Sequence, residues 1–203
     1  MNYSIQFENT NHHHIAVTPR KKALKHSLLT VTQGVVLIKI GKNEFAVESG
    51  QYFWIPADCL VSITFLAQSI VSTVTFSQRL SDPFTHSVGY VETNDIAVNA
   101  FHLLSEVPSN DEYHKVLLEV VRHEVRNIKP KLTTNSLSQQ FNSWLPDNNA
   151  GLNAEVHLSL KLREARKRLL SGQKTEQVAS EVFNLSTEEF RTLYEFGFGV
   201  TPQ

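Results

Sequence analysis

The sequence has little cysteine, little methionine and no long apolar run. Its single cysteine, Cys59, excludes an internal disulfide and is typical of a reducing cytoplasm, where we expect the protein to reside. The longest apolar runs, such as residues 34–38, are far shorter than the ~20 residues that cross a bilayer. No basic segment precedes an apolar one near the start, so we expect no signal peptide and no membrane partner.

The sequence also lacks an excess of charge of either sign. Lys and Arg total 19 against 20 Asp and Glu, which gives a net charge of −1 among 203 residues. This balance excludes a strongly basic nucleic-acid binder, but it permits a DNA-reading protein whose positive charge lies on one face. Hydrophobic residues make up 41% of the chain, enough for a globular core and too many for wholesale disorder.

The first 80 residues predict a set of short strands. Segments rich in β-branched and aromatic residues alternate with Gly, Asn and Asp every 8–12 residues, which is typical of an antiparallel barrel or sandwich. Residues 81–100 predict a loop with one or two further short strands. The expected strands cover residues 28–32, 35–40, 44–47, 51–55, 61–65 and 71–76.

The second half of the chain predicts helices. Apolar residues recur at three- and four-residue steps over 113–128, which indicates one amphipathic helix that ends before Pro130. This stripe is either a dimer seam or the face that covers the β region. Leu137 and Phe141 indicate a short helix in the polar stretch that follows. The stripe consists of Tyr113, Leu117, Val121, Val125 and Ile128.

The last fifty residues predict three helices. The first covers about 152–170 and ends at Gly172, the second covers 176–182, and the third follows a tight turn at 183–185. Ser186 and Glu189 have the spacing of a capping box at the start of that third helix. Two short helices joined by such a turn indicate a helix-turn-helix, whose second helix would enter the DNA major groove. We therefore predict an α+β protein, with a β-barrel or sandwich followed by an all-α region.

About 45 residues carry a family resemblance. The C-terminal segment resembles the second helix-turn-helix of AraC-type transcription regulators, and the N-terminal part looks like the cupin-type β-barrel that often precedes it. The match consists of Lys161, Leu162, Ala165, Leu169, Leu170, Val178, Ala179, Val182, Ser186, Phe190, Tyr194 and 198–202, and the cupin-like residues are His26, Leu28, Leu29, Gly34, Gly50 and 54–56.

The resemblance implies three parts. Residues 1–100 would be a sensing or dimerising cupin-like domain, 101–130 a connecting or dimerising helix, and 131–203 the helical region. The sequence departs from the family in the turn, which has Phe183 and Asn184 in place of Gly-Phe, and near 115–150, where little of a first helix-turn-helix is found. These departures predict a degenerate or shortened member of the family.

Candidate DNA contacts follow from the helical pattern. A basic cluster on the 152–170 helix would bind phosphates or simply form a solvated face. Ser186 and Thr187 would lie at the groove entry, with Arg191 on base edges. Residues 151–203 hold seven basic and seven acidic residues, which is a weak charge balance for a DNA-binding unit. Glu188 and Glu195 on the exposed face of the third helix would repel phosphates. The candidates are Arg163, Arg166, Lys167, Arg168, Lys174, Ser186, Thr187 and Arg191.

No residue pattern supports catalysis, a metal or a cofactor. A metal cupin needs several converging His and Glu ligands, and His26 has no companions at the required spacing. We predict that His12 to His14 form a surface tract. Glu119 and His123 are predicted to be a solvated pair on a helix, and Cys59 is predicted to be an inert thiol. Nucleophile, P-loop and dinucleotide motifs are missing, so we expect no enzyme.

We therefore expect a DNA-binding transcription regulator of the AraC type with a metal-free cupin-like domain. That domain would bind a small-molecule effector, with Tyr52 and Trp54 as candidate lining residues, or would form a homodimer, as would the 113–128 helix. The alternative is a protein-interaction module that does not bind DNA and modulates a related regulator or another partner. A third possibility is a small-molecule-binding cupin with a vestigial tail.

Overall fold

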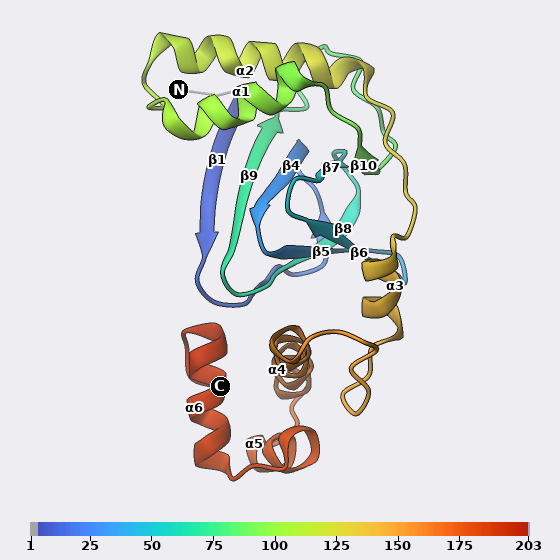
Figure 1. Ribbon diagram of the computed structural model, residues 1–203, viewed down its shortest axis with the longest axis vertical. Coiled ribbons are helices and arrows are strands. Elements are labelled where there is room, and N and C mark those ends of the chain that lie inside the picture. Colours follow the sequence, from blue (N-terminus) through green and yellow to red (C-terminus); the bar gives the residue numbers. More distant parts are fainter. Residues whose placement is uncertain (1–3, 203) are drawn as a thin grey trace.

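The computed structural model describes residues 4–202, which form an α+β structure in three layers (Figure 1). Helices α1 and α2 form one layer, two β-sheets the middle layer, and α4 to α6 the third, with α3 at its edge. The strands are β1 (Ile5–His12), β2 (Ala16–Val17), β3 (Lys21–Lys22), β4 (His26–Gln33), β5 (Val35–Ile40), β6 (Asn43–Glu48), β7 (Tyr52–Ile55), β8 (Leu60–Phe65), β9 (Ser69–Phe76) and β10 (Gly89–Val91). The helices are α1 (Asp95–Glu106), α2 (Glu112–Glu124), α3 (Ser136–Ser143), α4 (Ala154–Leu170), α5 (Thr175–Val178) and α6 (Thr187–Phe198), with a 3-10 turn η1 (Val125–Asn127) and a π-helical turn η2 (Ala179–Phe183).

The β region consists of two antiparallel sheets. Sheet A has the order β1-β9-β4-β7-β10, and sheet B has the order β2-β8-β5-β6, with β3 also paired to β8. The chain passes from sheet A to sheet B at Gly34, whose φ is +80° and whose missing Cβ would lie 3.0 Å from the Ser69 Cα. Within residues 4–202 no ladder joins the edges of the two sheets. The sequence predicted either a barrel or a sandwich. The closed barrel is therefore wrong, and the sandwich is confirmed.

The space between the two sheets is filled by apolar side chains. Alternate residues of β4, Leu29 and Val31, point into it, as do Phe53 from sheet A and Ile38 from sheet B. All four are at most 2% exposed. Neighbouring residues on a strand face opposite sides, so Leu28, Tyr52 and Trp54 belong to the outer face of sheet A instead.

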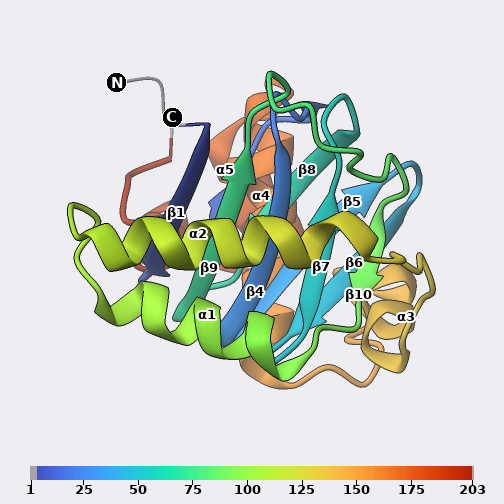
Figure 2. The ribbon, with the colours of Figure 1, turned by 90° about the horizontal axis from the view of Figure 1, so that it is seen from above.

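Helices α1 and α2 cover that outer face. They lie side by side across sheet A (Figure 2). Leu117, Val121 and Val125 of the predicted apolar stripe are buried against the sheet, whereas Tyr113 is 49% exposed. The interpretation of the stripe as a cover for the β region is thus confirmed for its central residues. Helix α1 begins at Asp95, before the predicted domain boundary at residue 100.

The outer edge of β6 is closed by polar side chains of α3. The Ser138 hydroxyl accepts from the Ala46 N–H at 2.9 Å, and the Asn142 amide both accepts from Glu44 N and donates to Glu44 O, each at 2.8 Å. Asn135, the N-cap of α3, donates to Ala46 O at 3.2 Å. These side chains share one face of α3, which therefore substitutes for a neighbouring strand.

The C-terminal helices follow the sequence prediction. The expected helix at 152–170 is α4, the expected helix at 176–182 is α5 with η2, and the third is α6. Ser186 and Glu189 form the predicted capping box. Nowhere in residues 4–202 is there a helix long and apolar enough to cross a membrane.

Asp82 fastens the loop between β9 and β10 to α2. Its side chain is 2% exposed, with Oδ2 2.8 Å from Arg122 Nη2 and Oδ1 2.6 Å from Arg126 Nε. Burial of the Asp82 carboxyl raises its pKa, but hydrogen bonds from Arg122 and Arg126 and their charges outweigh burial, and the pKa is lowered.

Replacing Asp82 by Asn should lower the free energy of unfolding by about 1–3 kcal/mol near neutral pH, because the negative charge opposite Arg122 and Arg126 is lost and an amide NH2 replaces one accepting oxygen. Because the folded-state pKa is depressed, this stabilisation is present above the unfolded value of about 3.9 and is lost as pH falls through the folded pKa. Urea unfolding of both proteins at neutral and acidic pH measures the difference. A difference that does not shrink in acid would show that the carboxylate charge contributes nothing.

Candidate functional site

The turn before α6 is fixed by local geometry. The π-helical turn η2 ends at Asn184, which takes the left-handed conformation with φ 56°. Ser186 then caps α6, because its Oγ accepts from Glu189 N at 3.3 Å while Glu189 Oε2 accepts from Ser186 N at 2.9 Å. The hydrogen bonds from Ser186 lower the pKa of Glu189. Ser186 is therefore committed to the cap, as the sequence predicted.

One apolar cluster holds α4, α5, η2 and α6 together. Phe190 and Tyr194 of α6 pack with Ala165 of α4 and with Val178 and Ala179, and all five are at most 5% exposed. We call residues 154–199, which these elements span, the helical unit. The opposite face of α6 is exposed and carries Glu188, Arg191, Thr192, Glu195 and Phe196, which is 79% exposed, with Thr187 half-buried.

The C-terminal end of α6 docks on the β region. Ile15, between β1 and β2, is 3% exposed within the core of the helical unit, and its N–H donates to Gly197 O at 2.8 Å. His14 Nδ1 lies 3.1 Å from Phe196 O. A Cβ at Gly197 would lie 2.5 Å from Leu162 Cδ1, so glycine permits this approach. The N-terminal end of α6 points away from the sheets (Figure 1).

Arg163, the first residue of the predicted basic cluster, binds the β region. Its Nη1 and Nη2 each lie 2.9 Å from an oxygen of Glu44 in β6. The side chains of Arg163 and Glu44 are 20% and 13% exposed. This bidentate pair joins α4 to sheet B and leaves Arg163 little access to a phosphate.

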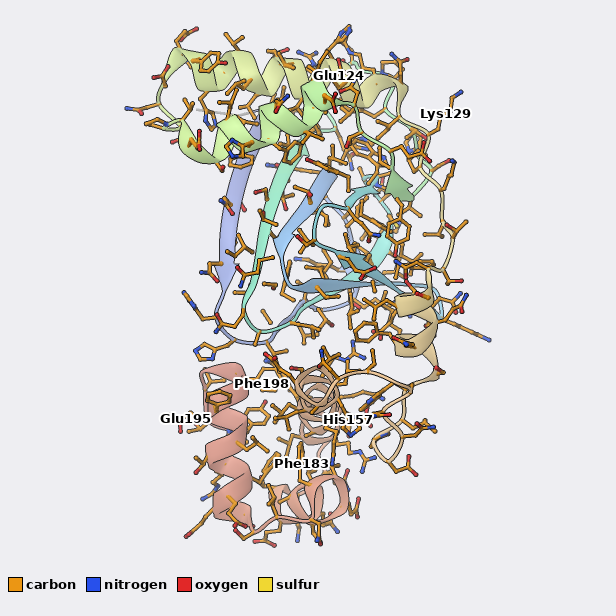
Figure 3. All side chains as sticks on the ribbon, viewed as in Figure 1. Glu124, Lys129, His157, Phe183, Glu195 and Phe198 are labelled. Carbon is orange, nitrogen blue, oxygen red and sulfur yellow. The ribbon has the colours of Figure 1, made fainter. Side chains whose placement is uncertain are left out.

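The other three residues of the basic cluster also have partners. The Arg166 guanidinium lies 4.9 Å over the Phe198 ring, whose place at the end of α6 is seen in Figure 3. Lys167 pairs with Glu164 at 3.2 Å, and Arg168 pairs with Glu164 at 3.2 Å and Glu181 at 3.3 Å. Lys167 is 77% exposed, so its ion pair is weak and open to competition. The remaining candidates, Lys174 and Arg191, are exposed, and the structure of residues 4–202 gives neither an ion pair.

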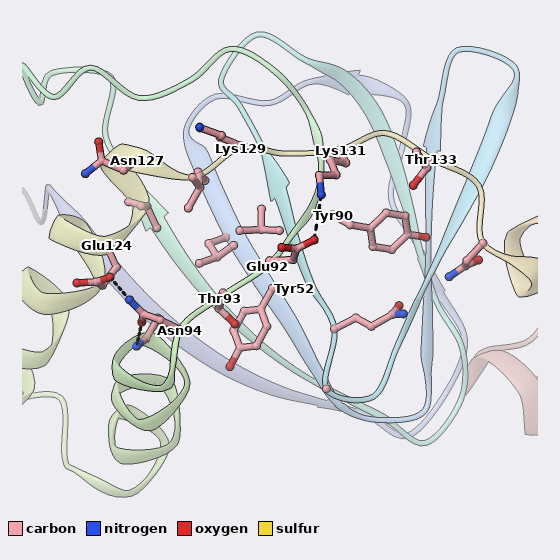
Figure 4. A pocket seen from close by; sticks show the side chains of 18 residues that line it. Tyr52, Tyr90, Glu92, Thr93, Asn94, Glu124, Asn127, Lys129, Lys131 and Thr133 are labelled. Carbon is pink, nitrogen blue, oxygen red and sulfur yellow. Dashed lines mark hydrogen bonds and ion pairs between the residues drawn. The ribbon is translucent and has the colours of Figure 1, made fainter.

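A pocket of about 850 Å³ lies on the flank of sheet A, between β7, β10, the start of α1 and the connection from α2 to α3 (Figure 4). Tyr52 lines it, and burial raises the pKa of the Tyr52 hydroxyl. Trp54, the other candidate ligand residue, is fully buried in the core, where its Nε1 donates to Thr85 O at 3.0 Å. Trp54 therefore lies outside this pocket and serves the packing of sheet A.

The connection from α2 to α3 forms one wall of the pocket. Lys131 and Tyr90 exchange two backbone hydrogen bonds of 2.9 Å, which extends sheet A beyond β10. Lys131 Nζ also lies 3.0 Å from Glu92 Oε1, and Asn94 Nδ2 donates to Glu124 Oε2 at 2.5 Å. In the sequence this connection is a polar segment without periodicity. Only its Asn and Thr residues indicate that it forms hydrogen bonds.

The histidines and Cys59 do not gather into a site. His26 stacks on Trp54 with 5.7 Å between ring centroids, and burial lowers its pKa. Burial raises the pKa of the Cys59 thiol. Glu119 pairs with Arg122 at 3.0 Å rather than with His123. Among residues 4–202 no three His, Cys, Asp or Glu side chains are placed to hold a metal ion.

No protein-family model matches the sequence, and no curated protein matches it. Among solved structures, the chain is similar to apo ToxT from Vibrio cholerae, with 11% identity over 99% of this chain and 96% of that chain and a TM-score of 0.41. It is similar to unsaturated fatty acid-bound ToxT from Vibrio cholerae, with 13% identity, 99% and 94% coverage and a TM-score of 0.39. A cupin superfamily protein from Desulfitobacterium hafniense has 12% identity over 38% of this chain and 72% of that chain, with a TM-score of 0.36. At these TM-scores the similarities assign no function to this chain.

Arg163 should matter for stability and Lys167 should not. Arg163→Ala removes two hydrogen bonds to a half-buried carboxylate and should lower the free energy of unfolding by about 1.5–3 kcal/mol. Lys167→Ala, a matched loss of one positive charge on the same helix, should change it by less than about 0.5 kcal/mol. Urea unfolding of both variants makes the comparison. Equal effects would contradict a structural role for Arg163.

Proposed function

We propose that this protein is a DNA-binding transcription regulator of the AraC type. The observation that carries the proposal is the capped helix α6, which packs on α4 and α5 after a tight turn, as the second helix of a helix-turn-helix would, and has one face exposed to solvent. In proteins with this motif, the second helix enters the major groove with its N-terminal residues against base edges. The family resemblance of the same residues supports this proposal.

Arg191 and Thr187 are the proposed base-reading residues. Arg191 lies one turn into α6 on its exposed face, where a guanidinium reaches guanine O6 and N7. Lys174, Arg166 and Lys167 are the proposed phosphate contacts. Lys174 is exposed, and Arg166 lies over the Phe198 ring and has no ion pair within residues 4–202. Arg163 is left out, because Glu44 holds it.

The β region is proposed to sense an effector or to form a homodimer. We also propose that the protein acts in the cytoplasm and has no catalytic activity. Its inter-sheet space is filled, so an effector would bind elsewhere. Dimerisation through α2 would use the residues of that helix that face solvent. Of these, Tyr113 and Val116 are 49% and 51% exposed.

A second candidate function is favoured by the charges around α6. Glu188 and Glu195 flank Arg191 on the exposed face, and they repel phosphates. The cluster that would compensate them is largely paired with Glu44, Glu164 and Glu181. A helical unit with this balance suits a protein-interaction module that does not bind DNA and modulates a related regulator or another partner.

Binding to a labelled random-sequence duplex across a salt series distinguishes the two candidates. A DNA-binding unit should bind at low salt, with log K falling against log salt by about 0.9 per phosphate contacted. Lys167→Ala should reduce that slope by about one, whereas Arg191→Ala should cost about 1–3 kcal/mol, mainly on a selected operator. Arg79→Ala, which removes one exposed positive charge from the loop after β9, is the matched control and should leave the slope unchanged.

Absence of binding even at low salt, in a protein whose folding is verified, would reject the DNA-binding proposal and favour the interaction module. A slope that Arg79→Ala lowers as much as Lys167→Ala does would show that binding is diffuse and does not use the helical unit.

A further inference from the structure

We propose that one edge of sheet B is a docking surface for an extended, acidic segment of a partner protein that also carries an apolar side chain. The surface is the segment 19–25, which contains β3 and which we call the basic edge. It lies outside the helical unit, so the proposal holds whether or not the protein binds DNA. In a chain of net charge −1, the basic edge has no acidic residue and four basic ones, which are Arg20, Lys21, Lys22 and Lys25.

The positive charges of the basic edge have no acidic partner. Residues 20–22 are exposed, and within residues 4–202 neither they nor Lys25 form an ion pair. Lys25 donates instead to the neutral Gln6 Oε1. Asp58 approaches the segment, because its N–H donates to Ala23 O at 2.8 Å, but its carboxylate has no ion pair within the same residues. An excess of positive charge therefore faces the solvent here, and it is complementary to an acidic partner.

The backbone of the basic edge is open on one side. Strand β3 lies at the margin of sheet B, and within residues 4–202 its ladder partner is β8 alone. Ala23 donates its N–H to Cys59 O at 2.9 Å. Because bonding alternates along an antiparallel ladder, the N–H and C=O of Lys22 are directed away from β8. A segment that adds beside β3 would be hydrogen-bonded there, in the manner of strand addition.

An apolar groove lies beside this open backbone. Its volume is about 350 Å³, and its lining includes Ala23, Leu24 and Ile63 together with Ile55 and Val61. Ile55 and Val61 are buried, whereas Ala23 and Ile63 are half-buried and Leu24 is 79% exposed. The groove thus offers accessible apolar surface within the cluster of cations. An apolar side chain of the docked segment would cover this surface and remove it from water.

The combination of features selects a protein segment over other occupants. Lysines on an edge strand also keep other strands away, but an edge that served only this purpose would not expose Leu24 among them. Phosphates of a nucleic acid would gain nothing from Leu24 and Ile63. A bilayer surface has no N–H and C=O groups in strand geometry to offer the backbone of Lys22. An acidic segment with one apolar side chain satisfies the charges, the open backbone and the groove together.

The test begins with selection of a displayed library of random dodecapeptides on the full-length protein at low salt, without DNA. The enriched peptides should carry Asp or Glu residues on both sides of an apolar residue. One enriched peptide is then labelled, and its affinity is measured by fluorescence polarisation. It should bind at least tenfold more weakly when Asn and Gln replace its acidic residues. It should also bind more weakly as salt rises, because salt screens exposed charges.

Variants of the basic edge locate the binding. The double variant Lys21→Gln/Lys22→Gln removes two exposed charges and should weaken peptide binding at least tenfold. Leu24→Ser should weaken it at least fivefold and leave its salt dependence unchanged. Lys42→Gln/Lys129→Gln removes two exposed charges elsewhere, is the matched control and should bind the peptide as the unaltered protein does. All these positions are exposed, so urea unfolding should show that each variant keeps the stability of the unaltered protein.

Three results would overturn the proposal. They are a selection that enriches no acidic peptides, a control double variant that binds as weakly as Lys21→Gln/Lys22→Gln, and tighter binding of a DNA duplex or of phosphatidylserine-containing vesicles that Lys21→Gln/Lys22→Gln abolishes. Arg191→Ala should weaken binding to an operator and leave peptide affinity unchanged. Failure of this proposal and failure of the proposed DNA binding are therefore distinguishable.

Discussion

The placement of the whole C-terminal half depends on how the edge of β6 is satisfied. An exposed strand edge leaves N–H and C=O groups unpaired, and Ala46 is fully buried, so each of its unpaired groups would cost about 1–3 kcal/mol. Helix α3 supplies the missing partners through Asn135, Ser138 and Asn142. The Tyr90 hydroxyl adds a bond of 2.6 Å to Ala46 O. A helix with three correctly spaced polar side chains thus replaces a strand.

The same strand also positions α4. Glu44 offers its backbone to Asn142 and its carboxylate to Arg163, so a single residue contacts both α3 and α4. Leu37 of β5 and Leu66, which follows the end of β8, pack with Leu160 of α4 and complete this contact with apolar surface. The helical unit is therefore bonded to the β region at β6 and at Ile15, two separate places, and its orientation is determined by both.

The sequence predicts local structure better than distant contacts. Alternation of apolar residues located six strands, and the Ser186–Glu189 spacing located the start of α6, because each signal lies within a few residues. Strand β1 was missed, because Asn and Glu residues dilute its apolar pattern. Helix α1 was missed, because its N-cap Asn94 and its first residue Asp95 are residue types that are common in loops.

The candidate sites show the same division. The exposed face of α6 was predictable from helical periodicity, whereas the partner of Arg163 lies 119 residues away and gives no signal in one sequence. The pocket was not predictable, because its lining comes from four stretches of chain, at residue 28 and within 50–52, 90–97 and 124–135. Tyr52 was identified by residue type, but Trp54, two residues later on the same face, is committed to packing with Phe76 and Phe84.

Ile15 gives the protein an unusual order of assembly. This residue completes the apolar core of a helical unit whose last helix ends more than 180 residues later, at Phe198. On the ribosome, the β region leaves the exit tunnel well before α6 does, with synthesis proceeding at about 5–20 residues per second. For those seconds Ile15 remains a solvent-exposed apolar group at the margin of a nearly finished β-sandwich. Ile15 and α6 can thus be joined only after α6 has left the exit tunnel.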